Sequence, residues 1–230
     1  MNITDILTGF VSSIPKGASH ISGLSGSSSA LFLALRREPF IAVEKAEEEA
    51  NRLFEDIRFF LSLIQTSRSI HFLPEPNGPE SSGRRAKVVR SLKEGDSVVT
   101  SLRGFETPVW SREDLLGNSL DIVTGKEADR NEMEEWLETL GYRRVSLVME
   151  KGEYSTRGWI LDIFPSTEDH PVRVEFFGDE IESVKSFDID SQRSFNRIEH
   201  ITIMPVGEPQ TGSVIHSLVK ARVFFIDPTV

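Results

Sequence analysis

PVRVEFFGDEIE, residues 171–182, contains a run in which apolar side chains alternate with charged ones. Val172, Val174 and Phe176 would lie on one side of an extended chain, and the residues between them on the other. This alternation is typical of a strand with one face on a core. The Gly178-Asp179 pair that follows is typical of a tight turn, so the stretch predicts an antiparallel hairpin.

More strand patterns surround this hairpin. They occupy residues of about 143–149, 153–164 and 181–188, and Ile201 to Met204 predicts one more. The connections are short and no helix intervenes, which indicates antiparallel pairing. An amphipathic pattern over 130–140 predicts one helix before the strands. We therefore expect an α+β domain with an antiparallel sheet over residues 113–205.

The first half of the chain alternates between helical patterns and short apolar strands. This order is typical of a parallel sheet with helical crossovers, so we expect an α/β domain over residues 1–112. A last apolar run at 223–226 predicts a buried strand, and residues 206–230 would return the chain to the first domain in truncated form. The strand patterns are Phe40–Val43, Ile70–Leu73 and Ser97–Leu102, and the helical patterns are 5–14, 30–35 and 46–64.

The composition narrows the classes of function. The net charge is −10, whereas nucleic-acid binding usually leaves a basic footprint. The tight basic cluster is Arg84-Arg85-Ala86-Lys87, which is also compatible with a solvated helix start. There is no cysteine, no apolar run of membrane-spanning length and no secretory signal, so we expect a cytoplasmic location without a membrane partner.

Patterns typical of catalysis or metal binding are incomplete. Gly23–Ser29 opens a helix as a phosphate-binding loop does, but Ser28 and Ser29 stand where such a loop needs Lys and Thr. The five histidines share no metal-ligand spacing. The run that begins at Asp188 resembles a calcium loop, but Arg193 occupies the position of the turn glycine. We expect no catalytic residue, cofactor or metal.

The charged side of the central strand is the candidate binding surface. Arg173, Glu175 and Phe177 share this side, and Arg144 and Arg157 lie on strands that precede it. Arginine beside an aromatic residue is typical of protein interfaces, so we predict that these five residues form one docking face. The alternative is that Arg173 and Glu175 pair with each other and only stabilise the sheet.

Several motifs closely resemble domain 2 of the UvrB excision-repair family. They are GEYSTRG at 152–158, DIFP at 162–165 and RVEFFGDEIE at 173–182. GYR at 141–143 and FDIDSQR at 187–193 are similar to the transcription-repair coupling factors, which begin with a UvrB-like module. A weaker resemblance over 20–115 implies that the first domain is a degenerate RecA/ATPase-like domain.

The resemblance implies a partner. In these families domain 2 docks UvrA, and the contact positions carry over to Arg144, Arg157, Arg173 and Glu175. It implies an adaptor that is not an enzyme, with RNA polymerase and DNA bound only by parts of a longer protein. Two alternatives remain open at this point. One is a residual nucleotide-binding domain, and the other is DNA binding through the basic residues Arg84, Arg85, Lys87 and Arg90.

Overall fold

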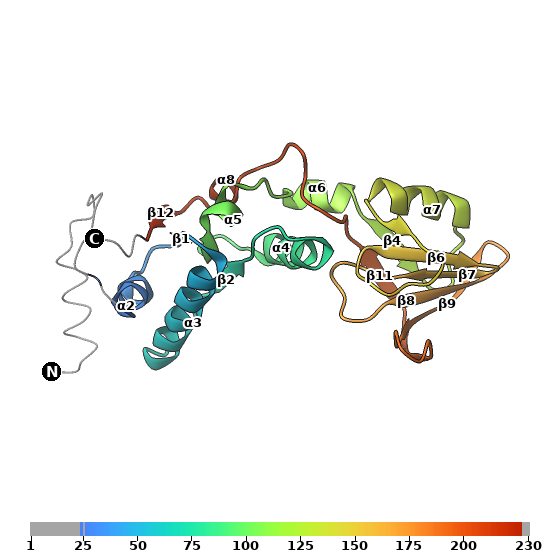
Figure 1. Ribbon diagram of the computed structural model, residues 1–230, viewed down its shortest axis with the longest axis horizontal. Coiled ribbons are helices and arrows are strands. Elements are labelled where there is room, and N and C mark those ends of the chain that lie inside the picture. The colour runs from blue at the N-terminus through green and yellow to red at the C-terminus, as the bar shows by residue number, and fades with distance from the viewer. Residues whose placement is uncertain (1–23, 25, 227–230) are drawn as a thin grey trace. The chain divides into compact units, whose positions relative to one another are not determined.

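The computed structural model describes residues 24 and 26–226, and these form two compact units (Figure 1). Among these residues, the first unit takes 24, 26–75, Ser91–Pro108 and 213–226, and the second takes Pro76–Arg90 and Val109–Gly212. This division differs from the boundaries expected at 112 and 205, because residues 76–90 belong with the second unit. The helix expected over 5–14 lies outside the described residues.

A four-stranded parallel sheet forms the first unit. Its order is β12-β1-β3-β2, and every neighbouring pair is parallel. The strands are β1 (Phe40–Glu44), β2 (Ile70–Leu73), β3 (Ser97–Ser101) and β12 (Arg222–Phe225). All residues of β1 and β3 are buried, as a central strand of a parallel sheet requires. The expectation that the last strand is buried was wrong, because β12 is an edge strand and Phe225 is largely exposed.

Helices connect and cover these strands. α3 (Glu47–Leu63) begins with three glutamates, which suit the positive end of the helix dipole, and Glu49 accepts a hydrogen bond from the backbone N–H of Ala46. Its buried face packs with α2 and β1 in one apolar core. The described part of the unit also contains the helices α2 (Ser28–Leu35), α5 (Leu102–Glu106) and α8 (Ile215–Val219).

A six-stranded sheet dominates the second unit, in the order β10-β9-β8-β7-β6-β5. All neighbouring strands are antiparallel except the short pair β5 and β6. A second, two-stranded sheet pairs β4 (Leu120–Val123) with β11 (His200–Ile203). The chain is therefore mixed α/β, with one parallel sheet and separate antiparallel sheets. The six strands are β5 (Arg143–Arg144), β6 (Glu153–Arg157), β7 (Ile160–Ile163), β8 (Val172–Phe177), β9 (Glu180–Phe187) and β10 (Ser194–Ile198).

Some strand boundaries differ from the expected ones. The strand expected over 153–164 is two strands, since Gly158 adopts a positive φ of 58° and turns the chain between β6 and β7. The strand expected over 143–149 is limited to residues 143–144. β4 and β10 were not expected, because short strands with few buried residues carry a weak alternation signal.

The second unit has an apolar core on one face of its large sheet. α7 (Arg130–Thr139) packs there through Met133 and Leu137, against inward residues of the strands such as Tyr154 and Val174. Val172, Val174 and Phe176 are all buried in β8, which confirms the alternation predicted for this strand. A smaller cluster of Val148, Phe164 and Phe187 lies apart from this core.

Helix α4 (Pro79–Ser91) is anchored within the second unit. Gly83 lies directly against the backbone of Ser166, where a side chain would collide with the carbonyl oxygen. Arg85 is 1% exposed, and its Nε lies 2.9 Å from a carboxylate oxygen of Glu208. The other helix of the unit is α6 (Arg112–Gly117). No helix among the described residues has the length and apolarity needed to cross a bilayer.

Candidate functional site

The face of the six-stranded sheet opposite α7 carries most of the predicted site residues. Strand register decides this, because Arg173 of β8 lies between Asp162 of β7 and Lys185 of β9. Glu175 lies beside Ser183 in the same way. Since alternate residues of a strand share a face, these side chains form one surface. We call it the polar face, and it consists of Ser155, Arg157, Asp162, Arg173, Glu175, Phe177, Ser183 and Lys185.

A buried carboxylate occupies the centre of the polar face. Asp162 accepts two hydrogen bonds from Arg173, at 2.7 Å from Nε and 2.9 Å from Nη2. It accepts a third bond from Arg157, at 3.2 Å. The bond to Asp162 is the main reason that the pKa of Arg173 lies above its ordinary value. Two guanidinium groups therefore share one carboxylate.

A second charged pair lies beside this group. Glu175 accepts hydrogen bonds from Lys185 at 2.6 Å and from Ser183 at 2.5 Å. These bonds, that of Lys185 first, hold the pKa of Glu175 below its ordinary value. The alternative in which Arg173 and Glu175 pair with each other was wrong. Arg173 bonds to Asp162 of β7, and Glu175 bonds to Lys185 of β9.

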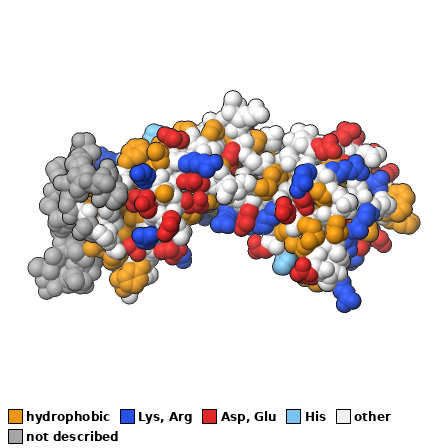
Figure 2. Space-filling view, in the orientation of Figure 1, with side chains coloured by type: hydrophobic (Ala, Val, Ile, Leu, Met, Phe, Trp, Pro, Cys, Tyr) orange, Lys and Arg blue, Asp and Glu red, His pale blue; other side chains and the backbone are white. Residues whose placement is uncertain are grey.

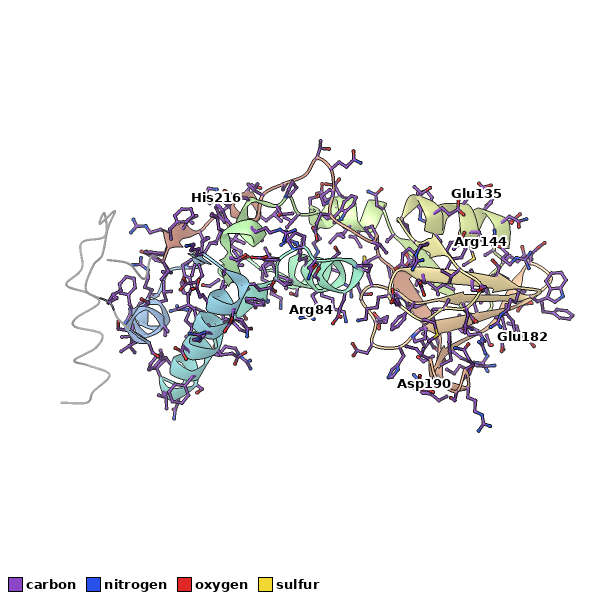
Figure 3. All side chains as sticks on the ribbon, in the orientation of Figure 1. Arg84, Glu135, Arg144, Glu182, Asp190 and His216 are labelled. Carbon is purple, nitrogen blue, oxygen red and sulfur yellow. The ribbon has the colours of Figure 1, made fainter. Side chains whose placement is uncertain are left out.

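Arg144 lies apart from the other predicted residues. Its partner in the register is Tyr154, whose side chain belongs to the core on the α7 side. Arg144 accordingly forms an ion pair of 3.2 Å with Glu134 of α7, and Figure 3 shows it beside that helix. The prediction that all five residues share one face was wrong for Arg144. β5 pairs in parallel with β6, and this pairing fixes which side each of its residues faces.

Aromatic side chains mark the hairpin end of the sheet. Phe177 closes the polar face before the turn at Gly178, and its side chain is 77% exposed. Trp159 lies in the neighbouring turn and is also exposed, with the guanidinium of Arg130 5.9 Å from its ring centroid. Exposed aromatic residues beside arginine are typical of protein-binding surfaces.

Burial lowers the number of basic side chains that α4 exposes to solvent. Arg85 is enclosed with Glu208, so its guanidinium is not available to a phosphate backbone. Arg84 is exposed but pairs with Glu80 at 2.8 Å. Lys87 and Arg90 remain exposed. Figure 2 shows basic side chains interspersed with acidic ones on the visible face, which is unlike a nucleic-acid interface.

An acidic residue of α3 lies beside the loop before α2. Gly23 and Ser25 lie outside the described residues, and Gly26 adopts a positive φ of 53°. Ser27 donates a hydrogen bond of 2.7 Å from its hydroxyl to Asp56 of α3. A carboxylate near the start of a helix competes with a phosphate group for the same position.

The other candidate sites have structural partners. His71 and His200 each lie within 3.0 Å of an aspartate oxygen, and no cluster among the described residues has the ligands for a metal. The carboxylate of Asp188 accepts bonds from the backbone N–H and the hydroxyl of Ser191. This side chain stabilises the turn that resembled a calcium loop.

Two charged members of the polar face, Asp162 and Lys185, were missed in the sequence. Asp162 lies within the apolar run Ile160–Ile163, and a single carboxylate in such a run is a signal of a buried charge pair. Lys185 had no distinguishing signal, because only the register of β9 against β8 brings it beside Glu175.

Comparison with known proteins matches residues 120–208 to the family model of the UvrB interaction domain. The chain carries a UvrB interaction domain. This domain contains β4 to β11 and α7, and therefore the whole polar face. α4 lies outside the matched residues, although it packs within the same unit.

Curated relatives are similar over much of the chain. The transcription-repair-coupling factor of Bacillus subtilis is 30% identical over 208 residues, which cover 82% of this chain and 17% of the relative. That of Mycobacterium bovis is 32% identical over 182 residues, which cover 74% of this chain and 15% of the relative. That of Escherichia coli is 40% identical over 108 residues, which cover 47% of this chain and 9% of the relative. The chain is homologous to the UvrB-like module of these factors, and it spans less than a fifth of their length.

Proposed function

We propose that this chain is a non-catalytic adaptor that recruits the excision-repair protein UvrA through the polar face. The observation that carries the proposal is the position of this face within a UvrB interaction domain. Homology to the transcription-repair-coupling factors supports a role in joining stalled transcription to repair.

The polar face has the chemistry of a protein contact. Arg157 is 52% exposed and uses one hydrogen bond to Asp162, so most of its N–H groups point to solvent. Phe177 supplies an apolar group at the edge of the same surface. An arginine and an aromatic residue of this kind commonly contribute most of the affinity of an interface.

Arg157→Ala tests the proposal in an isothermal titration with purified UvrA. We expect the affinity to fall by about tenfold or more, because a partner carboxylate would be left without its guanidinium. Arg144→Ala is the matched control, because Arg144 is 59% exposed and also forms an ion pair of 3.2 Å, but lies on the α7 side. We expect this control to stay within about twofold of the wild type. Equal losses in both variants would contradict the assignment of the polar face.

We also propose that the first unit is a degenerate RecA/ATPase-like scaffold without ATPase activity. Its parallel sheet with helical crossovers supports the relationship. The serines at positions 28 and 29 and the bond from Ser27 to Asp56 support the loss of nucleotide binding. An isothermal titration that detects micromolar ATP binding would contradict it. We further propose that contacts with RNA polymerase and DNA belong to the parts of the longer relatives that this chain does not span.

A further inference from the structure

We propose that Asp162 is a positioning residue that holds Arg157 and Arg173 in the geometry required for binding, and that the group it directs them towards is a carboxylate. This inference rests on the proposed docking of UvrA. Asp162 itself is not a contact residue, because its side chain is 2% exposed and lies beneath both arginines.

The geometry around Asp162 is that of a clamp. Arg173 uses Nε and Nη2 to bind both carboxylate oxygens, an arrangement that fixes the plane of the guanidinium as well as its position. The oxygen that accepts from Nη2 of Arg173 also accepts the bond from Arg157. One buried oxygen of β7 therefore orients two arginines on the strands that flank it, β6 and β8.

Arg173 is held from two further directions. Its Nη1 donates to the carbonyl oxygen of Gln192 at 3.2 Å, and its guanidinium carbon lies 4.7 Å from the ring centroid of the buried Phe187. Gln192 is in the left-handed conformation, with φ of 58°, and its backbone N–H donates to the carbonyl oxygen of Asp188. Arg173 is thus a fixed support, while Arg157 keeps its free N–H groups at the surface.

Charge identifies the chemistry of the ligand. Two guanidinium groups and one carboxylate leave a net charge of +1, and the neighbouring Glu175 and Lys185 cancel each other. The excess positive charge lies on the exposed guanidinium of Arg157, whose planar fork fits a carboxylate with two parallel hydrogen bonds. The matching site on the partner is therefore an Asp or Glu side chain.

Pre-orientation gives Asp162 its effect on affinity. A free arginine loses rotamer entropy when it is fixed at an interface, and a side chain already held in place loses less. Asp162→Asn keeps the shape of the side chain but removes its charge. We expect it to weaken UvrA binding by about tenfold.

A mutant cycle separates positioning from a general loss of structure. In the background Arg157→Ala/Arg173→Met, Asp162→Asn should change the affinity by less than about twofold, because the arginines through which it acts are gone. Melting curves of every variant set a temperature at which all are folded. A loss of equal size in both backgrounds would overturn the positioning role.

A second comparison is needed in case the Asp162→Asn variant does not fold, because this change leaves the charges of Arg157 and Arg173 without their shared carboxylate. Arg173→Met removes the second charge, so Asp162→Asn/Arg173→Met is compared with Arg173→Met. Weaker binding of the double variant shows that Asp162 acts through Arg157, and equal binding overturns the inference. If the wild-type chain itself fails to bind UvrA, the proposed function falls, and this inference with it. If the wild type binds and both Asp162 comparisons show no change, only the inference falls.

Discussion

Arg173 and Phe177 lie on the same side of β8, but their surroundings differ. Arg173 is 14% exposed and is bonded to Asp162 and to Gln192, so it is part of the interior of the polar face. Phe177, by contrast, is 77% exposed. Of two residues on the same side of one strand, one can therefore stabilise the domain while the other is available to contact a partner protein.

Arg173→Ala should lower the free energy of unfolding of the second unit by about 3 kcal/mol. The change leaves the buried carboxylate of Asp162 with Arg157 alone, and breaking a buried ion pair on one side is costly. Phe177→Ala is the control at an exposed position, where we expect a change under about 0.5 kcal/mol. Urea unfolding measures both, and equal small changes would contradict the support role of Arg173.

At the scale of elements, the carboxyl end of β1 carries an unusual acid. Glu44 is 9% exposed, and burial together with the negative charge of Glu49 raises its pKa to about 7. An acid whose pKa is raised on folding favours the folded state when protonated. Its contribution is fully present below the ordinary value of 4.5 and is lost as the pH rises through about 7.

Glu44→Gln should therefore remove a pH dependence from the first unit. Relative to this variant, the wild type is expected to lose up to about 3 kcal/mol of stability between about pH 5 and pH 8. The measurement is a series of thermal or urea unfolding curves for both proteins across that range. A difference between them that stays constant with pH would show that Glu44 does not titrate there.

For the whole molecule, the distribution of charge argues against DNA binding. The net charge of −10 repels a phosphate backbone, and burial removes Arg85 from the basic cluster of α4. We expect duplex DNA to bind with a Kd weaker than about 10 µM at ~150 mM salt, and with steep salt dependence. Fluorescence anisotropy tests this, with Lys87→Glu/Arg90→Glu as the variant that should abolish residual binding. A tight complex that resists salt would assign a real site to α4.

The sequence by itself determined the class of the fold and the core side of its central strand. Alternation placed Val172, Val174 and Phe176 inside, and short apolar runs predicted the parallel strands at 40–44 and 97–101. Local patterns suffice for these features, because they depend on which side chains avoid water along one strand.

The tertiary structure alone decided which of the charged residues meet. Register between strands brought Asp162 beneath Arg157 and Arg173, and the parallel pairing of β5 placed Arg144 on the α7 side. Packing of Gly83 and Arg85 assigned α4 to the second unit. These contacts join residues far apart in the chain, and no periodicity within one segment carries information about its partner, so they became visible only once the strands were paired.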